Sequence, residues 1–367
     1  MDKNFSFNHV NTAVVVGVKL PDNNYGEVNN SLEELKFLAK TLGISIKNSF
    51  IQSRNNIDPS YYIGKGKLDE IKDYIQKNNI EAVLFDVELT GVQERNLEKY
   101  LDKTIFGRTE LILNIFNKHA KTKEAKLQVQ FACLEYLMPR LRNRWDHFSR
   151  IEGGIGLRGG EGEKQIELDR RMIQNQIKKV KDKLKKVDTQ MQNRRKKRTG
   201  SNIVSLIGYT NAGKSTLFNQ LSKSAVYTEN MLFSTLDSTI RKVYINDKLT
   251  ILLSDTIGFI SKLPTNLIAS FKSTLQEIIS SKLIIHVIDA SSPNILKNIQ
   301  SVNNILKELK ADNIQCIRVF NKIDLLENGK TDCIINNEDH DLYISALKNH
   351  GIDKLKEKIS DFFVMAN

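Results

Sequence analysis

Hydrophobic residues between positions 10 and 108 fall into short β-branched runs, separated by longer segments with a helical repeat. The runs predict strands at Ala13–Val18, Ile44–Ile51, Ala82–Phe85 and Thr104–Phe106. The segments between them predict helices at Ser31–Leu42, Leu68–Lys77 and Val92–Leu101. Strands that alternate with helices indicate a small α/β domain, which we place at residues 1–117.

Two residue pairs in this domain have the spacing of a capping box. They are Ser31 with Glu34, and Thr90 with Gln93. In such a box each side chain accepts a hydrogen bond from the backbone N–H of the other residue. Both pairs therefore predict helix starts.

The next stretch carries two apolar seams whose members lie alternately four and three residues apart. The first seam is Leu127, Phe131, Leu134, Met138 and Leu141, and the second is Ile173, Ile177, Val180, Leu184, Val187 and Met191. Stripes this narrow are typical of coiled coils and require a partner. The sequence GGIGLRGGEG at 153–162 lies between them. We therefore predict an antiparallel two-helix arm over 118–199 with 153–162 as its tip loop. The alternative is a plain flexible linker.

From residue 200 to 367 the pattern returns to strands and helices. Strands are predicted at Ile203–Ile207, Lys242–Ile245, Thr250–Leu253, Leu283–Asp289, Gln315–Phe320 and Leu342–Ile344. The expected fold class is thus α/β: an N-terminal α/β domain with a coiled-coil arm, followed by a second α/β domain.

The net charge of +12 is concentrated in the arm. Residues 118–200 contain 23 basic and 10 acidic residues, whereas the rest of the chain is almost neutral. A basic excess confined to one segment favours contact with a polyanion such as RNA, although a solvated helix face is the alternative. The candidate RNA contacts are Arg158, Lys178, Lys179, Lys183, Lys185 and Lys186.

Cysteine usage and hydropathy indicate a cytoplasmic protein. Three widely spaced cysteines show neither a metal nor a disulfide pattern. The first residues lack the pattern of a secretory signal, and the longest apolar run is far too short for a membrane span. Any membrane association is expected to be peripheral, and no feature requires more than a monomer.

The sequence GYTNAGKS at 208–215 follows a predicted strand and precedes a predicted helix, as the phosphate-binding motif G-x-x-x-x-G-K-[ST] requires. Its glycines allow backbone N–H groups to surround phosphate oxygens. Lys214 is expected to reach the β and γ phosphates, and the Ser215 hydroxyl to bind Mg²⁺. The predicted loop contacts are Gly208, Tyr209, Thr210, Asn211, Ala212, Gly213, Lys214, Ser215 and Thr216.

Two later motifs favour guanine over adenine. In NKID, Asp324 is expected to accept two N–H bonds from the guanine edge, which adenine does not offer. Asn321 is expected to face O6 and N7 of the base, with the stem of Lys322 packed over it. In SAL, formed by Ser345, Ala346 and Leu347, the backbone N–H of Ala346 is expected to meet O6.

The sequence DTIGF at 255–259 supplies the remaining candidates for a phosphate-sensing switch. Asp255 is expected to hold Mg²⁺ through water, and the N–H of Gly258 to contact the γ phosphate, with Thr256 and Ile257 between them. Thr235 is the candidate that closes on Mg²⁺ and the γ phosphate, and Thr239 is the alternative. The predicted catalytic set is Lys214, Thr235 and Gly258, and the reaction is hydrolysis of GTP.

Two competing interpretations remain. One is a small-molecule kinase or ATPase, which NKID and SAL disfavour. The other is an RNA-binding or remodelling protein whose nucleotide turnover is incidental. The Gly64–Lys67 run GKGK also allows a second nucleotide site in the N-terminal domain, but a turn before a helix is the favoured interpretation.

Taken with these motifs, the sequence resembles the HflX-type GTPases of the Obg–HflX group. The resemblance rests on DPSYYIGKGKLDEI, FDVELTGVQERNLEK, RTELILNIFNKHAKTKEAKLQVQ, GGIGLRGGEGEKQIELDRR, GYTNAGKS, FSTLD and DTIGF. It implies a G domain over 200–367 and binding to the large ribosomal subunit and its RNA. It also implies, for some members, splitting or rescue of stalled or idle ribosomes under stress. Asn211 matches the loop Asn of GTPases that use K⁺.

Three departures from the family pattern stand out. The tip loop reads RGGEGEK rather than RGPGET, with Lys164 where Thr is usual, and Ser238 replaces a Pro in the switch. Many members carry a further C-terminal domain, which this chain is expected to lack.

Phe259 occupies the position of the Gln that orients water in many small GTPases, so slow intrinsic hydrolysis is expected.

Overall fold

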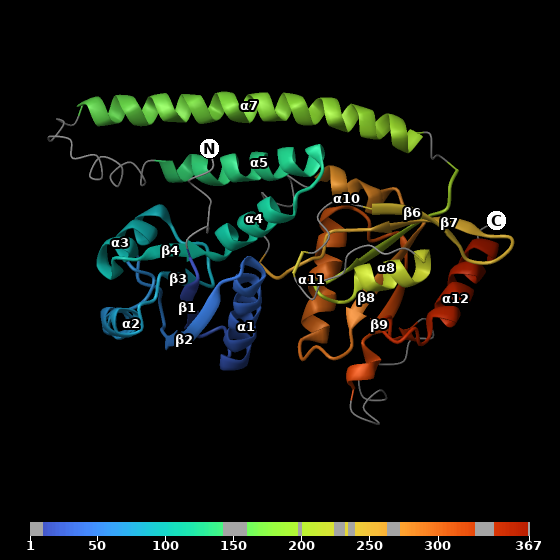
Figure 1. Cartoon of the computed structure of the whole chain (residues 1–367), viewed down its shortest axis with the longest axis horizontal. Helices are drawn as coiled ribbons and strands as arrows, with labels where there is room; N and C mark the ends of the chain where they lie inside the picture. The colour runs from blue at the N-terminus through green and yellow to red at the C-terminus, as the bar shows by residue number, and fades with distance from the viewer. Residues whose placement is uncertain are drawn as a thin grey trace. The chain divides into compact units, whose positions relative to one another are not determined.

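The computed structural model of the chain describes residues 10–141, 160–196, 200–223, 232–233, 239–262, 272–326 and 341–365. The chain divides into two compact units. One comprises Met1–Lys118 and Leu127–Leu184, and the other comprises His119–Lys126 and Lys185–Asn367. Figure 1 labels most of their helices and strands. None of the described helices is long and apolar enough to cross a membrane.

The first unit contains a parallel sheet with the strand order β2-β1-β3-β4. Its strands are β1 (Thr12–Lys19), β2 (Ser45–Ser53), β3 (Ala82–Phe85) and β4 (Thr104–Gly107). The central residues of β1 are all buried, which is typical of a parallel sheet covered on both faces. All four strands predicted for this domain are therefore confirmed.

Helices α1 (Tyr25–Leu42), α2 (Lys65–Lys77) and α3 (Gly91–Leu101) connect these strands. The capping box predicted at the start of α3 is confirmed. The Gln93 N–H donates to Thr90 Oγ1 at 3.3 Å, and the Thr90 N–H donates to Gln93 Oε1 at 3.0 Å.

The capping box predicted from Ser31 and Glu34 is wrong. Helix α1 begins earlier, where Asn24 and Glu27 cap each other reciprocally. The apolar repeat extends back to Val28, which is buried, so the helix continues towards the N-terminus through residues that sequence analysis left unassigned. Ser31 consequently lies inside the helix.

Helices α4 (Arg108–His119) and α5 (Lys123–Leu137) follow the sheet of the first unit. Sequence analysis did not assign α4, whose residues 108–116 are all buried, including the polar residues Arg108, Glu110 and Asn114. The first heptad helix was expected to reach Leu141. Instead α5 ends at Leu137, and a 3₁₀ turn, η1 (Met138–Arg140), follows it. Pro139 explains this end, since proline lacks the N–H that a helix requires.

The long helix α7 (Gly160–Lys196) lies antiparallel beside α5, as Figure 1 shows. Lys181 Nζ lies 3.7 Å from Glu135 Oε1 and 5.0 Å from the centre of the Phe131 ring. Val180, a member of the second seam, is 3% exposed. The predicted pairing of two helices is therefore confirmed.

The predicted tip loop is longer than the structure allows. Residues 160–162 belong to the first turn of α7, whereas residues 142–159, including Arg158, lie outside the described residues. A glycine costs a helix about 1 kcal/mol. Extending a helix that has already formed is favourable enough to offset part of that cost.

The second unit contains a sheet with the strand order β10-β9-β8-β5-β7-β6. The strands are β5 (Ile203–Gly208), β6 (Thr239–Tyr244), β7 (Thr250–Asp255), β8 (Leu283–Asp289), β9 (Gln315–Asn321) and β10 (Leu342–Tyr343). β6 pairs antiparallel with β7, and the other pairs are parallel. The carboxyl ends of β5, β7, β8 and β9 therefore meet at one edge, where α/β proteins bind ligands.

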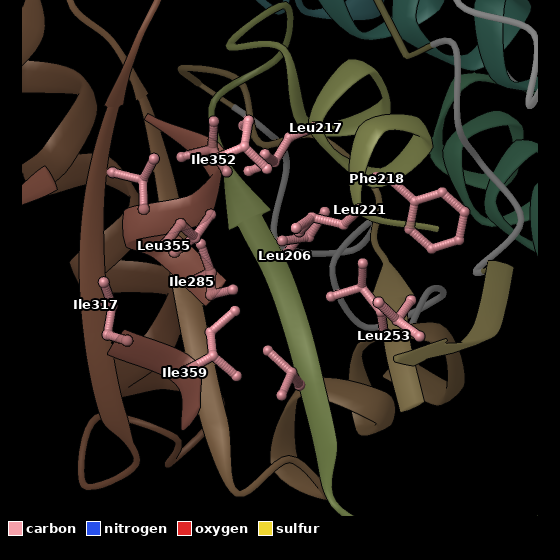
Figure 2. Close-up of a cluster of buried hydrophobic side chains, with 14 of the residues drawn as sticks. Leu206, Leu217, Phe218, Leu221, Leu253, Ile285, Ile317, Ile352, Leu355 and Ile359 are labelled. Atoms are coloured by element: carbon pink, nitrogen blue, oxygen red, sulfur yellow. The ribbon is translucent and has the colours of Figure 1, made fainter. Parts of the chain in front are cut away.

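Helices α8 (Lys214–Ser222), α10 (Lys272–Ile279), α11 (Ile295–Glu308) and α12 (Ile352–Met365) accompany this sheet, together with the 3₁₀ turn η2 (Ile323–Leu325). Figure 2 shows apolar side chains of α8 and α12 packed on the strands. They are Leu217, Phe218 and Leu221 of α8, and Ile352, Leu355 and Ile359 of α12. This packing fixes α8, which begins at the predicted phosphate loop.

Residues 119–126 belong to the second unit although the chain on either side belongs to the first. Within this short segment His119 Nδ1 lies 2.7 Å from the carbonyl oxygen of Phe233. Since a carbonyl oxygen only accepts, Nδ1 is the donor. The bond joins two residues of the second unit, of which Phe233 is buried.

Candidate nucleotide-binding site

The loop between β5 and α8 makes two close approaches that only glycine permits. A Cβ on Gly208 would lie 2.1 Å from the carbonyl oxygen of Val287, and one on Gly213 would lie 2.2 Å from Asn321 Nδ2. Asn211 and Gly213 also have left-handed backbone, with φ of 62° and 90°. The result is a tight turn that leads directly into the N-terminus of α8, where backbone N–H groups are free to bind an anion.

Lys214 is almost fully buried at the start of α8, with 6% of its surface exposed. Its Nζ donates to the carbonyl oxygens of Gly208 at 3.1 Å and Tyr209 at 2.9 Å. Burial and, to a smaller extent, the charge of Lys322 lower the pKa of Lys214 to about 8, against the attraction of Asp255. An anion placed beside this ammonium would stabilise its charged form.

Asp255 and Ser215 bring a carboxylate and a hydroxyl together beside Lys214. Asp255 ends β7 and is completely buried, and Ser215 Oγ donates to its Oδ2 at 2.8 Å. Carboxylate and hydroxyl oxygens are ligands that suit Mg²⁺, so this pair fits the metal role expected from the sequence.

Gly258 lies against the phosphate loop. A Cβ at this position would meet Thr210 Cγ2 at 2.8 Å and Lys214 Nζ at 3.0 Å. The structure thus brings together Lys214, Ser215, Asp255 and Gly258, which come from two strand ends.

Phe259 pairs with the phosphate loop through its backbone. Its N–H donates to the Gly208 carbonyl at 3.1 Å, and its carbonyl accepts from the Thr210 N–H at 2.6 Å. The hydroxyl of Tyr209 in turn accepts from the Ser261 N–H at 2.6 Å. The Phe259 side chain is buried in an apolar cluster, so it points into the core.

Two residues of DTIGF have structural partners that the sequence did not reveal. The Thr256 hydroxyl donates to the Leu206 carbonyl at 2.6 Å, and Thr256 is completely buried. Ile257 is 6% exposed. Their side chains hold β7 to β5 and fill the core, so only their backbone is left for the predicted nucleotide contact.

The Asn321 side chain joins two loops. Its Nδ2 donates to the Ala212 carbonyl at 2.9 Å, and its Oδ1 accepts from the Ala346 N–H at 2.9 Å. From the sequence, we expected the Asn321 amide and the Ala346 N–H to contact the base. In the structure they bond to each other, because β9 ends between the phosphate loop and the loop that follows β10.

Asp324 is oriented by the same second loop. The Ser345 hydroxyl donates to Asp324 Oδ1 at 2.5 Å and accepts from the Lys348 N–H at 3.1 Å. Ser345 is 1% exposed, whereas Asp324 is partly accessible. Asp324 Oδ2 therefore belongs to a fixed carboxylate that borders solvent, the arrangement that pairing with a guanine edge requires.

Lys322 has a partner that sequence analysis missed. Its Nζ lies 2.7 Å from Oδ2 of Asp289, the last residue of β8. Asp289 pairs with Asn321 across the parallel sheet, so two neighbouring strand ends supply the ion pair. The sequence signal for this ion pair was the acidic residue Asp289 at the end of a predicted strand.

The remaining candidates are dispersed or undescribed. Thr216 is partly exposed in α8, and Leu347 is 74% exposed beside the second loop. Thr235 lies outside the described residues, and Thr239 begins β6. The five candidate lysines of the arm are exposed on α7, and belong to both units: Lys178, Lys179 and Lys183 to the first, Lys185 and Lys186 to the second.

Three family models match consecutive parts of the chain. They are described as GTP-binding GTPase N-terminal at residues 29–117, GTP-binding GTPase Middle Region at 119–198, and 50S ribosome-binding GTPase at 203–322.

Curated relatives match over most of the sequence. GTPase HflX of Caldanaerobacter subterraneus subsp. tengcongensis is 43% identical, over 91% of this chain and 77% of the relative. GTPase HflX of Escherichia coli is 41% identical, over 90% of this chain and 78% of the relative. Among solved structures, that of SsGBP in complex with GDP is similar with a TM-score of 0.53 and 24% identity, over 97% of this chain and 99% of the other. This last similarity supports the fold alone.

Proposed function

Because this chain belongs to the HflX family of GTPases, we propose that its own loops bind GTP and hydrolyse it to GDP and phosphate. The observation that carries the proposal is the meeting of three motifs at the carboxyl ends of one sheet. The phosphate loop, the segment Asp255–Gly258 and the segment Asn321–Asp324 approach one another through the contacts described above.

Each charged residue at this edge has a role in the proposal. Lys214 binds the β and γ phosphates, for which its ammonium exchanges the carbonyls that now hold it. Ser215 and Asp255 hold Mg²⁺, Asp255 through water and Thr235 alongside them, and the ion neutralises phosphate charge when bound. The Gly258 N–H contacts the γ phosphate, and Asp324 accepts from the guanine edge.

Guanine specificity has a direct test. The unmodified protein is expected to bind GTP far more tightly than ATP, and Asp324→Asn is expected to remove much of that preference, because an amide cannot accept two bonds from the base edge. Competition of each nucleotide against a fluorescent GDP analogue measures both affinities. Equal affinity of the unmodified protein for ATP and GTP would refute the assignment.

We propose that the isolated protein hydrolyses GTP slowly and that the rate increases when a partner binds. The Phe259 side chain is buried in the core, so it neither donates to nor accepts from an attacking water. A second proposal concerns K⁺. Asn211, which has left-handed backbone within the loop, binds K⁺, and the bound ion offsets charge in the transition state. Phosphate release measured in K⁺ and in Na⁺ tests this, and equal rates contradict it.

The proposed partner is the large ribosomal subunit and its RNA, with splitting or rescue of stalled or idle ribosomes under stress as the outcome. Support comes from the 50S ribosome-binding description of the matched model and from the lysine face of α7. In this proposal residues 1–117, 118–199 and 200–367 are the working parts: an α/β domain, an RNA-contacting arm with Arg158 at its tip, and the G domain. The site of action is the cytoplasm, and the protein acts as a monomer.

Sedimentation of ribosomes tests the partner. The protein is expected to pellet with large subunits in the presence of a non-hydrolysable GTP analogue and less so with GDP. Neutralising Lys178, Lys179, Lys183, Lys185 and Lys186 should weaken binding and flatten its salt dependence, because fewer counterions are released. Deleting part of the segment 153–159 should instead preserve binding of nucleotide but abolish the change in the subunit profile. If both variants bound ribosomes and acted on them as the unmodified protein does, the proposed role of the arm would be refuted and the segment would be a plain linker.

A further inference from the structure

Asp289 is held from both sides at the end of β8. Its Oδ2 accepts from Lys322 Nζ at 2.7 Å, and its Oδ1 accepts from the backbone N–H and the hydroxyl of Ser291 at 3.0 Å and 2.6 Å. The side chain is only 20% exposed. Both carboxylate oxygens therefore have fixed donors, so the carboxylate has a single orientation.

Lys322 depends on this anchor. Its backbone adopts the left-handed region with φ of 66°, and its side chain is 22% exposed. Its ammonium also lies near enough to Lys214 for the two positive charges to repel each other. Without Asp289, the flexible lysine would lose the carboxylate that holds it, while the repulsion from Lys214 would remain.

We infer that Asp289 is a positioning residue of the guanine nucleotide site. Its carboxylate holds the Lys322 ammonium at the end of β8 and so fixes the aliphatic stem of Lys322 as the surface against which the base lies. The inference rests on the proposed GTP site and deepens it. It assigns a role to a residue that belongs to none of the recognised motifs.

The size of the effect follows from side-chain freedom. Immobilising a long flexible side chain on binding costs about 0.5–1.5 kcal/mol. The ion pair restrains Lys322 before the nucleotide binds. When the pair is lost, binding must also supply the free energy that immobilises this side chain. Asp289→Asn, which keeps the shape and an acceptor for Ser291 but removes the charge, should weaken GDP affinity about twofold to tenfold.

A double-mutant cycle on the full chain tests this role. GDP dissociation constants are measured for the unmodified protein, Asp289→Asn, Lys322→Met and the double variant. Methionine keeps a stem of similar length and removes the ammonium. Because Asp289 acts through that ammonium, Asp289→Asn should have no further effect in the Lys322→Met background. An undiminished effect there would show that Asp289 only shapes its own turn, and would overturn the inference.

Two further measurements guard the result. Asp312→Asn is the matched control, since Asp312 is exposed before β9, at the amino end of that strand, and should leave GDP affinity unchanged. IDP lacks the exocyclic amine that Asp324 is proposed to read, and Asp289→Asn should weaken IDP and GDP equally, since the stem touches the face of the base.

Folding and the parent proposal are separated in the same way. If Asp289→Asn does not fold, Asp289→Glu is measured instead, because it keeps the charge on a longer side chain. The GDP affinity of Asp289→Glu should lie closer to that of the unmodified protein than the GDP affinity of Lys322→Met does. A weaker affinity than Lys322→Met contradicts the inference. The proposed function fails on a different result: an unmodified protein that binds ADP as tightly as GDP.

Discussion

Two buried cations, Arg108 and Lys214, occupy equivalent places in the two units and have opposite surroundings. Each follows the carboxyl end of a strand in a largely parallel sheet, β4 for Arg108 and β5 with its loop for Lys214. Arg108 Nη1 lies 2.7 Å from Asp86 Oδ1, and its Nη2 pairs with Glu34. Lys214 is held by carbonyl oxygens of its own loop.

Their pKa values show the contrast. Burial acts to lower the pKa of Arg108, but Glu34 and Asp86 outweigh it, so the value is raised. For Lys214 burial prevails and brings the pKa to about 8. The same edge of the same kind of sheet thus serves two purposes. In the first unit carboxylates neutralise the charge within the protein, and in the second carbonyl oxygens hold the charge that we propose binds phosphate.

The largest expected effect comes from breaking the neutralised cation. Arg108→Met removes the cation that pairs with Glu34 and with the buried Asp86, and it should lower the free energy of unfolding by about 3–5 kcal/mol. GDP affinity of the folded fraction should not change. Denaturant unfolding measures the loss. Arg171→Met is the control, because the Arg171–Glu167 pair is exposed on α7 and should contribute little. Equal losses in the two variants would contradict the comparison.

Removing the other cation should reverse the pattern. Lys214→Met deletes a charge that burial disfavours, so the free energy of unfolding without nucleotide should stay level or rise. GDP affinity should fall about a hundredfold, since charge-assisted bonds to phosphate are lost. Titration with fluorescent GDP and a thermal melt give both values. A destabilised variant with unaltered affinity would show that Lys214 is a structural residue like Arg108.

An intermediate case sharpens the comparison. Arg140 Nη2 lies 2.7 Å from Glu88 Oε1, and Glu88 is 49% exposed. Because water can replace the lost partner of Glu88, Arg140→Met should cost only about 1–2 kcal/mol. The same denaturant series applies. A loss as great as that of Arg108→Met would mean that exposure of the carboxylate does not set the cost.

The smallest effect concerns pH and follows from the lowered pKa of Lys214. Between about 8 and the ordinary value of 10.5, the unfolded chain binds more protons at this residue than the folded protein. Stability without nucleotide should therefore rise with pH through this window, by at most tenfold per pH unit in the folding constant. Unfolding curves of the unmodified protein minus those of Lys214→Met isolate the contribution. Parallel curves would contradict it.

The strands were predicted well because their signal is local. β3 and β8 have the predicted ends, and the parallel strands read as short apolar runs. Helix α4 was missed although its residues 108–116 are all buried, because the polar residues Arg108, Glu110 and Asn114 within this run do not mark an exposed face. The start of α1 was misplaced because Asn24 was not recognised as its cap.

The structure brings the predicted motifs together at one edge of the sheet, but sequence analysis missed several of the contacts between them. Position in a motif placed Lys214, Ser215 and Asp255 at one edge, since each follows or ends a strand. It did not show that Asn321 bridges two loops, nor that Asp289 anchors Lys322. Those contacts join segments distant in sequence, and only the register of neighbouring strands brings them together.

The segment His119–Lys126 gives the chain a particular history during synthesis. It leaves the exit tunnel well before residues 203–365, with which it is united in the second compact unit. The first unit is likewise incomplete until residue 184 has been made. Neither unit is a continuous stretch of chain, so a fragment that begins at residue 200 would lack the segments 119–126 and 185–199 of the body to which it belongs.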